Sequence, residues 1–199
     1  MDVYRKKLQV KLYSLKYGLF FREHFYELLQ HTKILTFSEF DHIKLPIQND
    51  HLFFINEGLV AGTLEKKVDT KWYRLVKDME VFGNFQELTG IEIPKFYWHA
   101  VTKVELMAIP INILVSKLSI SPPNLENLVR HLSSVEIKRM HFLNHLSKLS
   151  AIEKFNFLES EIPELILKTR TSLLSNFLGL TRETLSRILK EKMHQPSLD

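Results

Sequence analysis

Cysteine is absent from the 199 residues of this sequence, which excludes disulfide bonds, thiolate nucleophiles and cysteine-bound metal centres. Glycine is scarce as well. The six glycines form no phosphate-binding loop of the P-loop or Rossmann type. The G-x-S-x-G and H-E-x-x-H patterns of hydrolases and zinc peptidases are missing. Because no catalytic motif is present, we expect a protein that is not an enzyme.

The nine histidines are scattered, and we expect no metal and no other cofactor. His141 and His145 have i,i+4 spacing on an expected helix, but no third ligand lies nearby in the sequence. A metal-dependent enzyme on a β-scaffold stays open as an alternative through His42, Asp50 and His51, although their spacing matches no known cluster.

Long apolar runs are also missing. The longest, LMAIPINILV at 106–115, is too short to cross a membrane, so we expect a cytoplasmic protein without a membrane partner. The net charge of +4 and the pI near 9.1 suit an anionic partner but do not identify one. The length allows a sensor domain followed by a small effector domain.

The clearest motif is TSLLSNFLGLTRETLSRI at 171–188. Gly179 can adopt the positive φ that a tight turn between two helices requires. The flanking positions supply the packing residues of such a corner, with a small Ser175 where the helices would approach. These packing residues are Leu174, Leu178, Leu180, Leu185 and Ile188. The spacing is typical of a DNA-binding helix-turn-helix, and an ordinary helical hairpin is the alternative.

The second helix of this motif has a polar face opposite its leucines. Thr181 is a good N-cap, and Arg182, Glu183, Ser186 and Arg187 follow on or beside the polar face. Arginine can donate two hydrogen bonds to guanine and glutamate can accept one from cytosine, so this face suits the major groove of DNA. A solvated surface with an i,i+4 pair between Glu183 and Arg187 is the alternative.

A long helix is predicted from Asn124 onward, after Pro122-Pro123. Its apolar residues follow alternating steps of three and four, interrupted only by Arg139, which is typical of a coiled-coil seam. This pattern predicts a homodimer, although the same seam could instead pack within one chain. The seam residues are Leu125, Leu128, Leu132, Val135, Phe142, Leu146 and Leu149.

Residues 34–109 contain short strand-forming segments between glycines, as expected of a jelly-roll. We expect Tyr73, Leu75, Val101, Val104 and Leu106 to line its interior. Residues 1–33 favour short helices packed on this roll.

The segment LGLTRETLSRIL at 178–189 resembles the recognition segment of the Crp/Fnr transcription regulators, the cyclic-AMP receptor protein group. LFFINEGLV at 52–60, VFGNFQELTG at 81–90 and WHAVTKVELMAIP at 98–110 resemble the family's sensor roll. The resemblance implies an α+β fold: a jelly-roll, cyclic-nucleotide-binding-like sensor at 1–120, a dimerisation helix at 121–149 and a helix-turn-helix domain at 150–199. It further implies a bacterial regulator that binds inverted-repeat DNA as a homodimer, with RNA polymerase as a partner.

In this interpretation two sets of residues contact DNA. Arg182, Glu183, Ser186 and Arg187 contact base edges. The phosphate contacts are assigned to Thr169, Arg170, Thr171, Ser172, Thr181 and Lys190. The alternative is an effector-binding module that regulates a protein partner without binding DNA.

The sequence departs from the family at the ligand pocket. Cyclic-AMP-binding relatives carry a glycine-glutamate pair and an arginine-serine pair, whereas the corresponding positions here are Gly83-Asn84 and Pro94-Lys95. We therefore expect cyclic AMP not to bind. An unidentified small effector would contact Gly83, Asn84, Lys95 and Trp98, although core packing is the favoured explanation for Trp98. Few residues follow the recognition segment, so we expect the family's β-hairpin wing to be missing or minimal.

Overall fold

The computed structural model describes residue 8 and residues 11–13, 30–43, 51–66, 70–83, 96–118 and 122–194. The described chain is α+β, as predicted: a set of antiparallel strands is followed by a series of helices. The expected N-terminal helices of 1–33 lie mostly outside the described residues. Within the described part, no helix is both long enough and apolar enough to cross a membrane.

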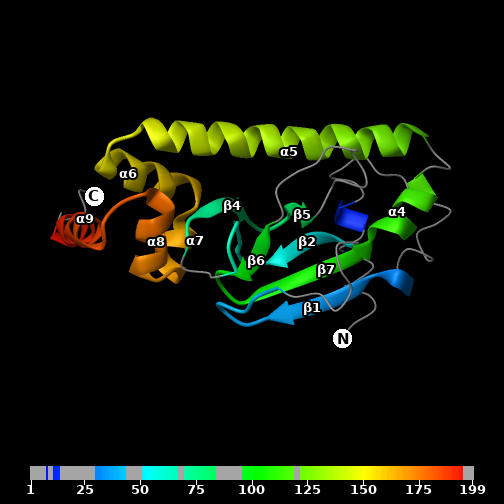
Figure 1. The fold of residues 1–199 in the computed structure, drawn as a ribbon, viewed down its shortest axis with the longest axis horizontal. Coiled ribbons are helices and arrows are strands. Elements are labelled where there is room, and N and C mark those ends of the chain that lie inside the picture. The colour runs from blue at the N-terminus through cyan, green and yellow to red at the C-terminus, as the bar shows by residue number, and fades with distance from the viewer. Residues whose placement is uncertain are drawn as a thin grey trace.

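Two antiparallel sheets form the N-terminal half (Figure 1). The four-stranded sheet has the order β1-β7-β2-β5, and the three-stranded sheet has the order β4-β3-β6. The four strands of the first sheet are β1 (Lys33–Phe37), β7 (Val104–Pro110), β2 (His51–Glu57) and β5 (Val81–Gly83). The second sheet contains β4 (Trp72–Val76), β3 (Val60–Thr63) and β6 (Tyr97–Ala100).

A turn at Gly58 joins β2 to β3, as expected from the glycines that separate the strand-forming segments of 34–109. Gly58 has a φ of +101°, and a Cβ atom there would lie 2.3 Å from the carbonyl oxygen of Lys103. The Gly58 amide donates a hydrogen bond to Asp78 Oδ1 at 2.6 Å, which fixes the turn against the β4–β5 connection. A glycine is therefore required here both by the backbone conformation and by the lack of space.

Buried side chains from both sheets fill the roll, including Ile55, Val60, Phe82, Val104 and Leu106. Val104 and Leu106 were predicted to be there. Val101 is also buried, but it packs in a separate cluster with the C-terminal helices. The prediction for β4 was wrong, because Tyr73 is 38% exposed and Leu75 is half-buried beside the helices. On this strand Trp72 and Val76 are the buried residues.

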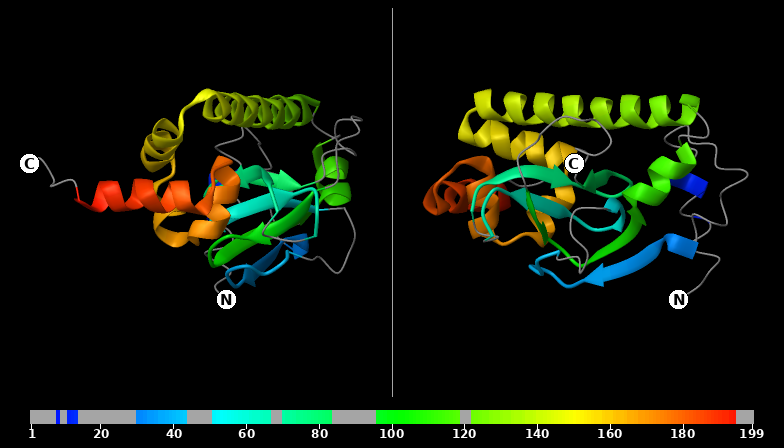
Figure 2. Two further views of the ribbon diagram at one scale, coloured as in Figure 1. Left: turned by 60° about the vertical axis from the view of Figure 1, so that its left-hand side comes forward. Right: turned by 45° about the vertical axis from the view of Figure 1, so that its right-hand side comes forward.

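Six described helices follow the strands. Helix α5 extends along the length of the molecule, with the sheets beside its first part and α6–α9 packed near its end (Figure 1 and Figure 2). The Ser150 side chain and Glu153 form a capping box that begins α6, and Pro163 is the first residue of α7. The bounds are α4 Ile111–Leu118, α5 Pro122–Lys148, α6 Ala151–Glu161, α7 Pro163–Lys168, α8 Thr171–Leu178 and α9 Arg182–His194.

Three leucines of the apolar seam of α5 pack within their own chain, so these positions do not join two copies as the prediction required. Leu128 and Leu132 belong to the core beside β2 and β7, and Leu146 belongs to the core of the C-terminal helices. Arg139, the interruption in the seam, is 9% exposed and donates a hydrogen bond to the Val81 carbonyl at 2.8 Å. The pattern is consistent with this outcome because every helix packed on a core has an apolar stripe. The opposite face of α5 exposes Ile137 and Met140.

The C-terminal helices and the roll share one apolar cluster. Trp72 of β4 packs against Phe177 of α8, with 5.8 Å between the ring centroids. The Arg170 guanidinium lies 4.0 Å from the ring centroid of Phe40, in the turn after β1. These contacts fix α8 against one end of the roll.

Candidate nucleic-acid interface

Helices α8 and α9 are joined by a tight turn at Gly179. This glycine has φ 65° and ψ 37°, the left-handed conformation that ends many helices. The Leu180 amide donates a hydrogen bond to the Ser175 carbonyl at 2.9 Å, which satisfies one of the last carbonyls of α8. Lys154 of α6 donates from Nζ to the Leu178 carbonyl at 2.9 Å. The predicted positive φ at Gly179 is therefore confirmed.

The corner between α8 and α9 is packed as the sequence predicted. Leu174 and Leu178 on α8 and Leu185 and Ile188 on α9 are between 0% and 4% exposed. Ser175 is 1% exposed, and its hydroxyl donates to the Ser172 carbonyl at 2.9 Å, so the small side chain needs no partner on α9. This apolar corner leaves one full side of α9 free to present its polar residues.

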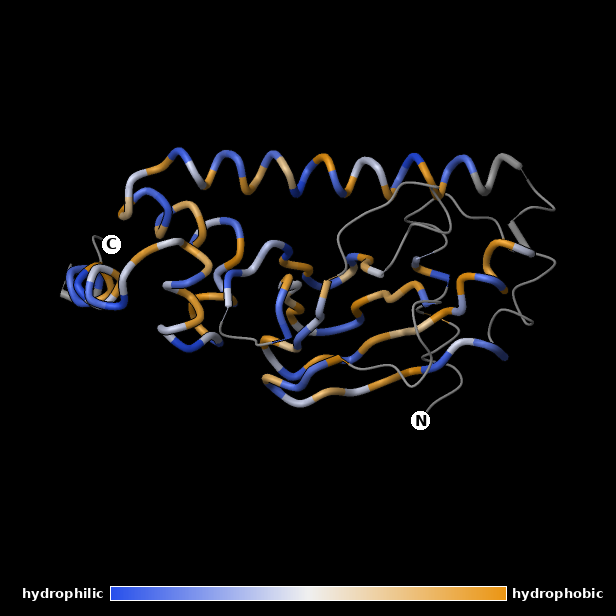
Figure 3. The backbone as a smooth tube through the Cα atoms, viewed as in Figure 1, coloured by the Kyte–Doolittle hydropathy of each residue, from blue (hydrophilic) through white to orange (hydrophobic). Residues whose placement is uncertain are grey.

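The outer side of α9 is polar and exposed. Arg182, Glu183, Ser186, Arg187 and Lys190 are all exposed, whereas the inward positions between them are buried or half-buried. Figure 3 shows α9 as mainly hydrophilic, and Figure 2 shows that this helix lies at the periphery of the molecule. The residues predicted to contact bases are thus brought together on one accessible helix face.

Thr181 begins α9 as predicted. Its hydroxyl accepts a hydrogen bond from the Thr184 amide at 3.1 Å, and its carbonyl accepts one from the Leu185 amide at 3.1 Å. A hydrogen bond with its own backbone lowers the pKa of Glu183, and the Thr181 hydroxyl lowers it further. Among the described residues Glu183 forms no ion pair with Arg187. The guanidinium of Arg187 is therefore not occupied by that carboxylate.

The residues predicted to contact phosphates are in three different situations. Thr171 is exposed and Ser172 is half-buried in the first turn of α8, where free amides favour an anion. Arg170 is exposed but already stacks on Phe40. The Thr169 hydroxyl is buried without a hydrogen-bond partner and cannot reach a phosphate in this arrangement, so we leave Thr169 out of the proposed contact set.

The two predicted effector residues that the structure describes, Gly83 and Trp98, lie in a packed part of the roll. Trp98 lies 4.6 Å from Phe82 and 5.7 Å from Phe96 between ring centroids, so it is a packing residue. A Cβ atom at Gly62 would lie 2.8 Å from Trp98 Cζ3, which leaves no space between the two. Gly83 follows the buried Phe82, and Asn84 and Lys95 lie outside the described residues.

The described histidines do not form a metal site. His99 is buried and its ring centroid lies 4.9 Å from that of His42. Burial, and to a lesser extent the charge of His42, lower the pKa of His99 to about 4. In the described ranges no three side chains of His, Asp or Glu lie close enough together to hold an ion.

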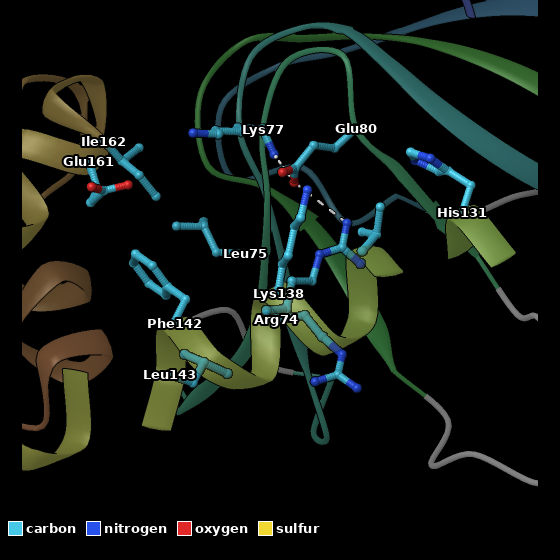
Figure 4. Close-up of a pocket in the computed structure, with 12 residues that line it drawn as sticks. Arg74, Leu75, Lys77, Glu80, His131, Lys138, Phe142, Leu143, Glu161 and Ile162 are labelled. Atoms are coloured by element: carbon cyan, nitrogen blue, oxygen red, sulfur yellow. Dashed lines mark hydrogen bonds and ion pairs between the residues drawn. The ribbon is translucent and has the colours of Figure 1, made fainter. Parts of the chain in front are cut away.

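The structure also contains a pocket that the sequence did not predict. A pocket of about 420 Å³ lies between β4, α5 and the boundary of α6 and α7 (Figure 4). Its lining includes Arg74, Lys77 and Lys138, which come from a strand, a turn and a helix. No local motif could reveal it, because the three residues line one pocket only when α5 packs on the second sheet.

No family model matches the chain, and no curated protein matches it in sequence. Solved structures do match its fold. A protein from Eubacterium rectale assigned to the Crp/Fnr family of transcriptional regulators matches with a TM-score of 0.69 and 16% identity, over 91% of this chain and 87% of that one. A cyclic nucleotide-binding domain-containing protein from Listeria monocytogenes matches with a TM-score of 0.61 and 20% identity, over 95% and 91%.

A Crp/Fnr-family transcriptional regulator from Thermus thermophilus gives a TM-score of 0.58 and 22% identity, over 82% of this chain and 87% of that one. These likenesses show the class of fold: a cyclic-nucleotide-binding type of roll, which in this chain is followed by a long helix and a group of short helices. The described chain therefore has the fold of the Crp/Fnr regulators, as the sequence motifs predicted.

Proposed function

We propose that this protein is a DNA-binding transcription regulator of the Crp/Fnr type that acts by binding rather than by catalysis. The observation that carries the proposal is the exposed polar face of α9, held outward by the buried corner around Gly179. The similarity of fold to Crp/Fnr regulators supports it. RNA polymerase is the proposed partner in the cytoplasm, and the proposed domains keep the predicted bounds of 1–120, 121–149 and 150–199.

Base recognition is assigned to Arg182, Glu183, Ser186 and Arg187. Both arginines lack an ion-pair partner among the described residues, so their guanidinium groups can donate to the two acceptors of guanine. Thr171, Ser172, Thr181, Lys190 and Arg170 are proposed to contact phosphates. For Arg170 this requires the guanidinium to leave the Phe40 ring, which couples DNA contact to the position of the roll.

We propose that two copies pair through the outward face of α5, because its inward face is occupied by the core. Ile137 is 51% exposed and Met140 is 61% exposed, and the small Ser133 lies one turn before Ile137. These positions follow steps of four and three, the spacing of a coiled-coil contact. A two-fold pair would present two α9 helices roughly 34 Å apart, one turn of DNA, and would favour an inverted repeat.

The proposal is tested by selecting bound duplexes from a random pool and then titrating the recovered site. Replacing Arg187 by alanine is expected to weaken the recovered site by roughly 1 to 3 kcal/mol and random DNA by much less. Lys33→Ala is the matched control, because it removes one exposed positive charge at the start of β1, away from α9. Failure to recover any sequence at low salt would favour the alternative function, an effector-binding module that regulates a protein partner without binding DNA.

A further inference from the structure

The pocket of about 420 Å³ has three walls from different parts of the fold. Strand β4 and the following turn form one wall, the middle of α5 forms the second, and the boundary of α6 and α7 forms the third. Figure 4 shows Glu161 and Ile162 at the side of the pocket opposite His131. A ligand here would contact the roll, the long helix and the C-terminal helices simultaneously.

The interior of this pocket is apolar. Leu75, Val135, Phe142, Leu143 and Ile162 all line it and are half-buried. Phe142 is supported from behind by Phe157, with 5.2 Å between their ring centroids. A partly exposed group of aliphatic and aromatic side chains in a concave site is the usual wall for the apolar part of a small molecule.

The charged residues of the pocket differ in their availability. Arg74 and Arg139 are both paired with Glu136, at 2.9 Å and 2.7 Å, and Arg139 also lies 3.5 Å from Glu80. Lys77 and Lys138, by contrast, are exposed and form no ion pair with any described residue. Two ammonium groups beside an apolar surface would therefore attract a negatively charged group.

Two carboxylates, those of Glu80 and Glu161, also line the pocket. The Glu80 carboxylate already has partners within the protein: it accepts a hydrogen bond from the Lys77 amide at 3.2 Å and lies beside Arg139. The four basic side chains exceed the acidic ones, even when Glu136 is added to these two carboxylates. The balance favours a ligand with one negative charge over a cation or a highly charged nucleotide.

We propose that this pocket binds a small organic anion with an apolar, preferably aromatic, body. The anionic group would lie between Lys77 and Lys138, and the apolar body would lie against Leu75 and Phe142. The site is separate from the roll interior, where Trp98 and Phe82 already occupy the space. This site uses residues of the second sheet and α5 rather than the effector residues predicted from the sequence.

Ile162 gives this site a connection to α9. It is the C-cap of α6 and the N-cap of α7, with φ −144° and ψ 67°. The chain therefore changes direction between the two helices at this residue. A ligand held against Ile162 and β4 stabilises the arrangement of α7–α9 in which these walls stay together. That regulatory consequence rests on the proposed DNA-binding function, whereas binding of the anion does not.

The test uses anilinonaphthalene sulfonate, an aromatic anion that fluoresces in apolar sites, and phenylnaphthylamine, its uncharged analogue. The full chain is expected to bind one equivalent of the sulfonate and to prefer it over the amine. The double variant Lys77→Glu/Lys138→Glu is expected to lose about tenfold in affinity for the sulfonate and to keep its affinity for the amine. Lys148→Ala, also exposed on α5 but outside the pocket, is the control and should bind like the parent.

A filling variant, Val135→Phe, should weaken both probes while circular dichroism shows that the fold is retained. Equal binding of the two probes by the parent, or equal sulfonate binding by parent and double variant, would overturn the proposal. Non-saturating binding of several equivalents would overturn it as well. Charge-dependent binding in a protein that ignores DNA would leave this inference standing and remove only the regulatory function.

Discussion

Replacing Arg139 by leucine distinguishes a seam packed within one chain from a seam between two chains. The guanidinium of Arg139 donates to the buried Val81 carbonyl at 2.8 Å and pairs with Glu136 at 2.7 Å and Glu80 at 3.5 Å. Leucine cannot make any of these contacts. We therefore expect Arg139→Leu to lower the free energy of unfolding of the single chain.

The size of the loss follows from the burial of each partner. Loss of a charged donor to the buried Val81 carbonyl costs about 1 to 3 kcal/mol. Glu136 and Glu80 are 31% and 27% exposed, so water replaces part of their interaction and each pair contributes about 0.5 to 1 kcal/mol. Burial of the leucine side chain recovers about 1 kcal/mol of this loss in the free energy of unfolding. The expected net destabilisation is about 1 to 4 kcal/mol.

The assay is urea unfolding at a dilution where the chain is monomeric, combined with sedimentation equilibrium at higher concentration. Ile137→Ser is the matched variant on the opposite face of the same helix. It should change unfolding of the monomer by less than about 0.5 kcal/mol, because Ile137 is 51% exposed, and should weaken association of two copies. A tighter dimer and unchanged unfolding for Arg139→Leu would refute the intramolecular packing of this seam.

Two further predictions concern stability. Gly179→Ala should lower the free energy of unfolding by about 1 to 2 kcal/mol, because φ is 65°. The cost comes from the backbone alone, since no atom lies within 4 Å of the added Cβ. Gly179→Asn should lower it less, and urea unfolding of the two variants measures the difference. Because burial lowers the pKa of His99 from 6.5 to about 4, the unfolded chain binds the proton first as pH falls, and stability present above pH 6.5 should be lost progressively toward pH 4. That loss should reach up to about 3 kcal/mol and should be smaller in His99→Gln. Urea unfolding at successive pH values measures it in both proteins. If stability falls with pH by the same slope in both, His99 is not its cause.

The sequence predicted the features that depend on short-range spacing. Gly179, the apolar corner and the polar face of α9 are encoded within about twenty residues, where helix geometry leaves few alternatives. The turn at Gly58 was predictable for the same reason. The fold could be predicted because these local motifs occur in a recognisable order.

Features that depend on long-range packing could not be predicted. The stripe on α5 is apolar whether it packs on its own roll or on a second copy, so periodicity alone could not assign Leu128 or Leu146. Tyr73 and Trp72 are both aromatic strand residues, and only the pairing of β4 with β3 decides which one is buried. The pocket between Lys77 and Lys138 arises from segments about sixty residues apart and leaves no local pattern.

Helix α9 is proposed to recognise a specific DNA sequence. Equilibrium titration of the parent protein against a duplex recovered by selection and against a scrambled duplex of equal length, at the same salt concentration, tests it most directly. The recovered duplex is expected to bind at least about 10³ times more tightly than the scrambled one. A ratio close to one, with both affinities falling equally as salt is raised, would contradict it.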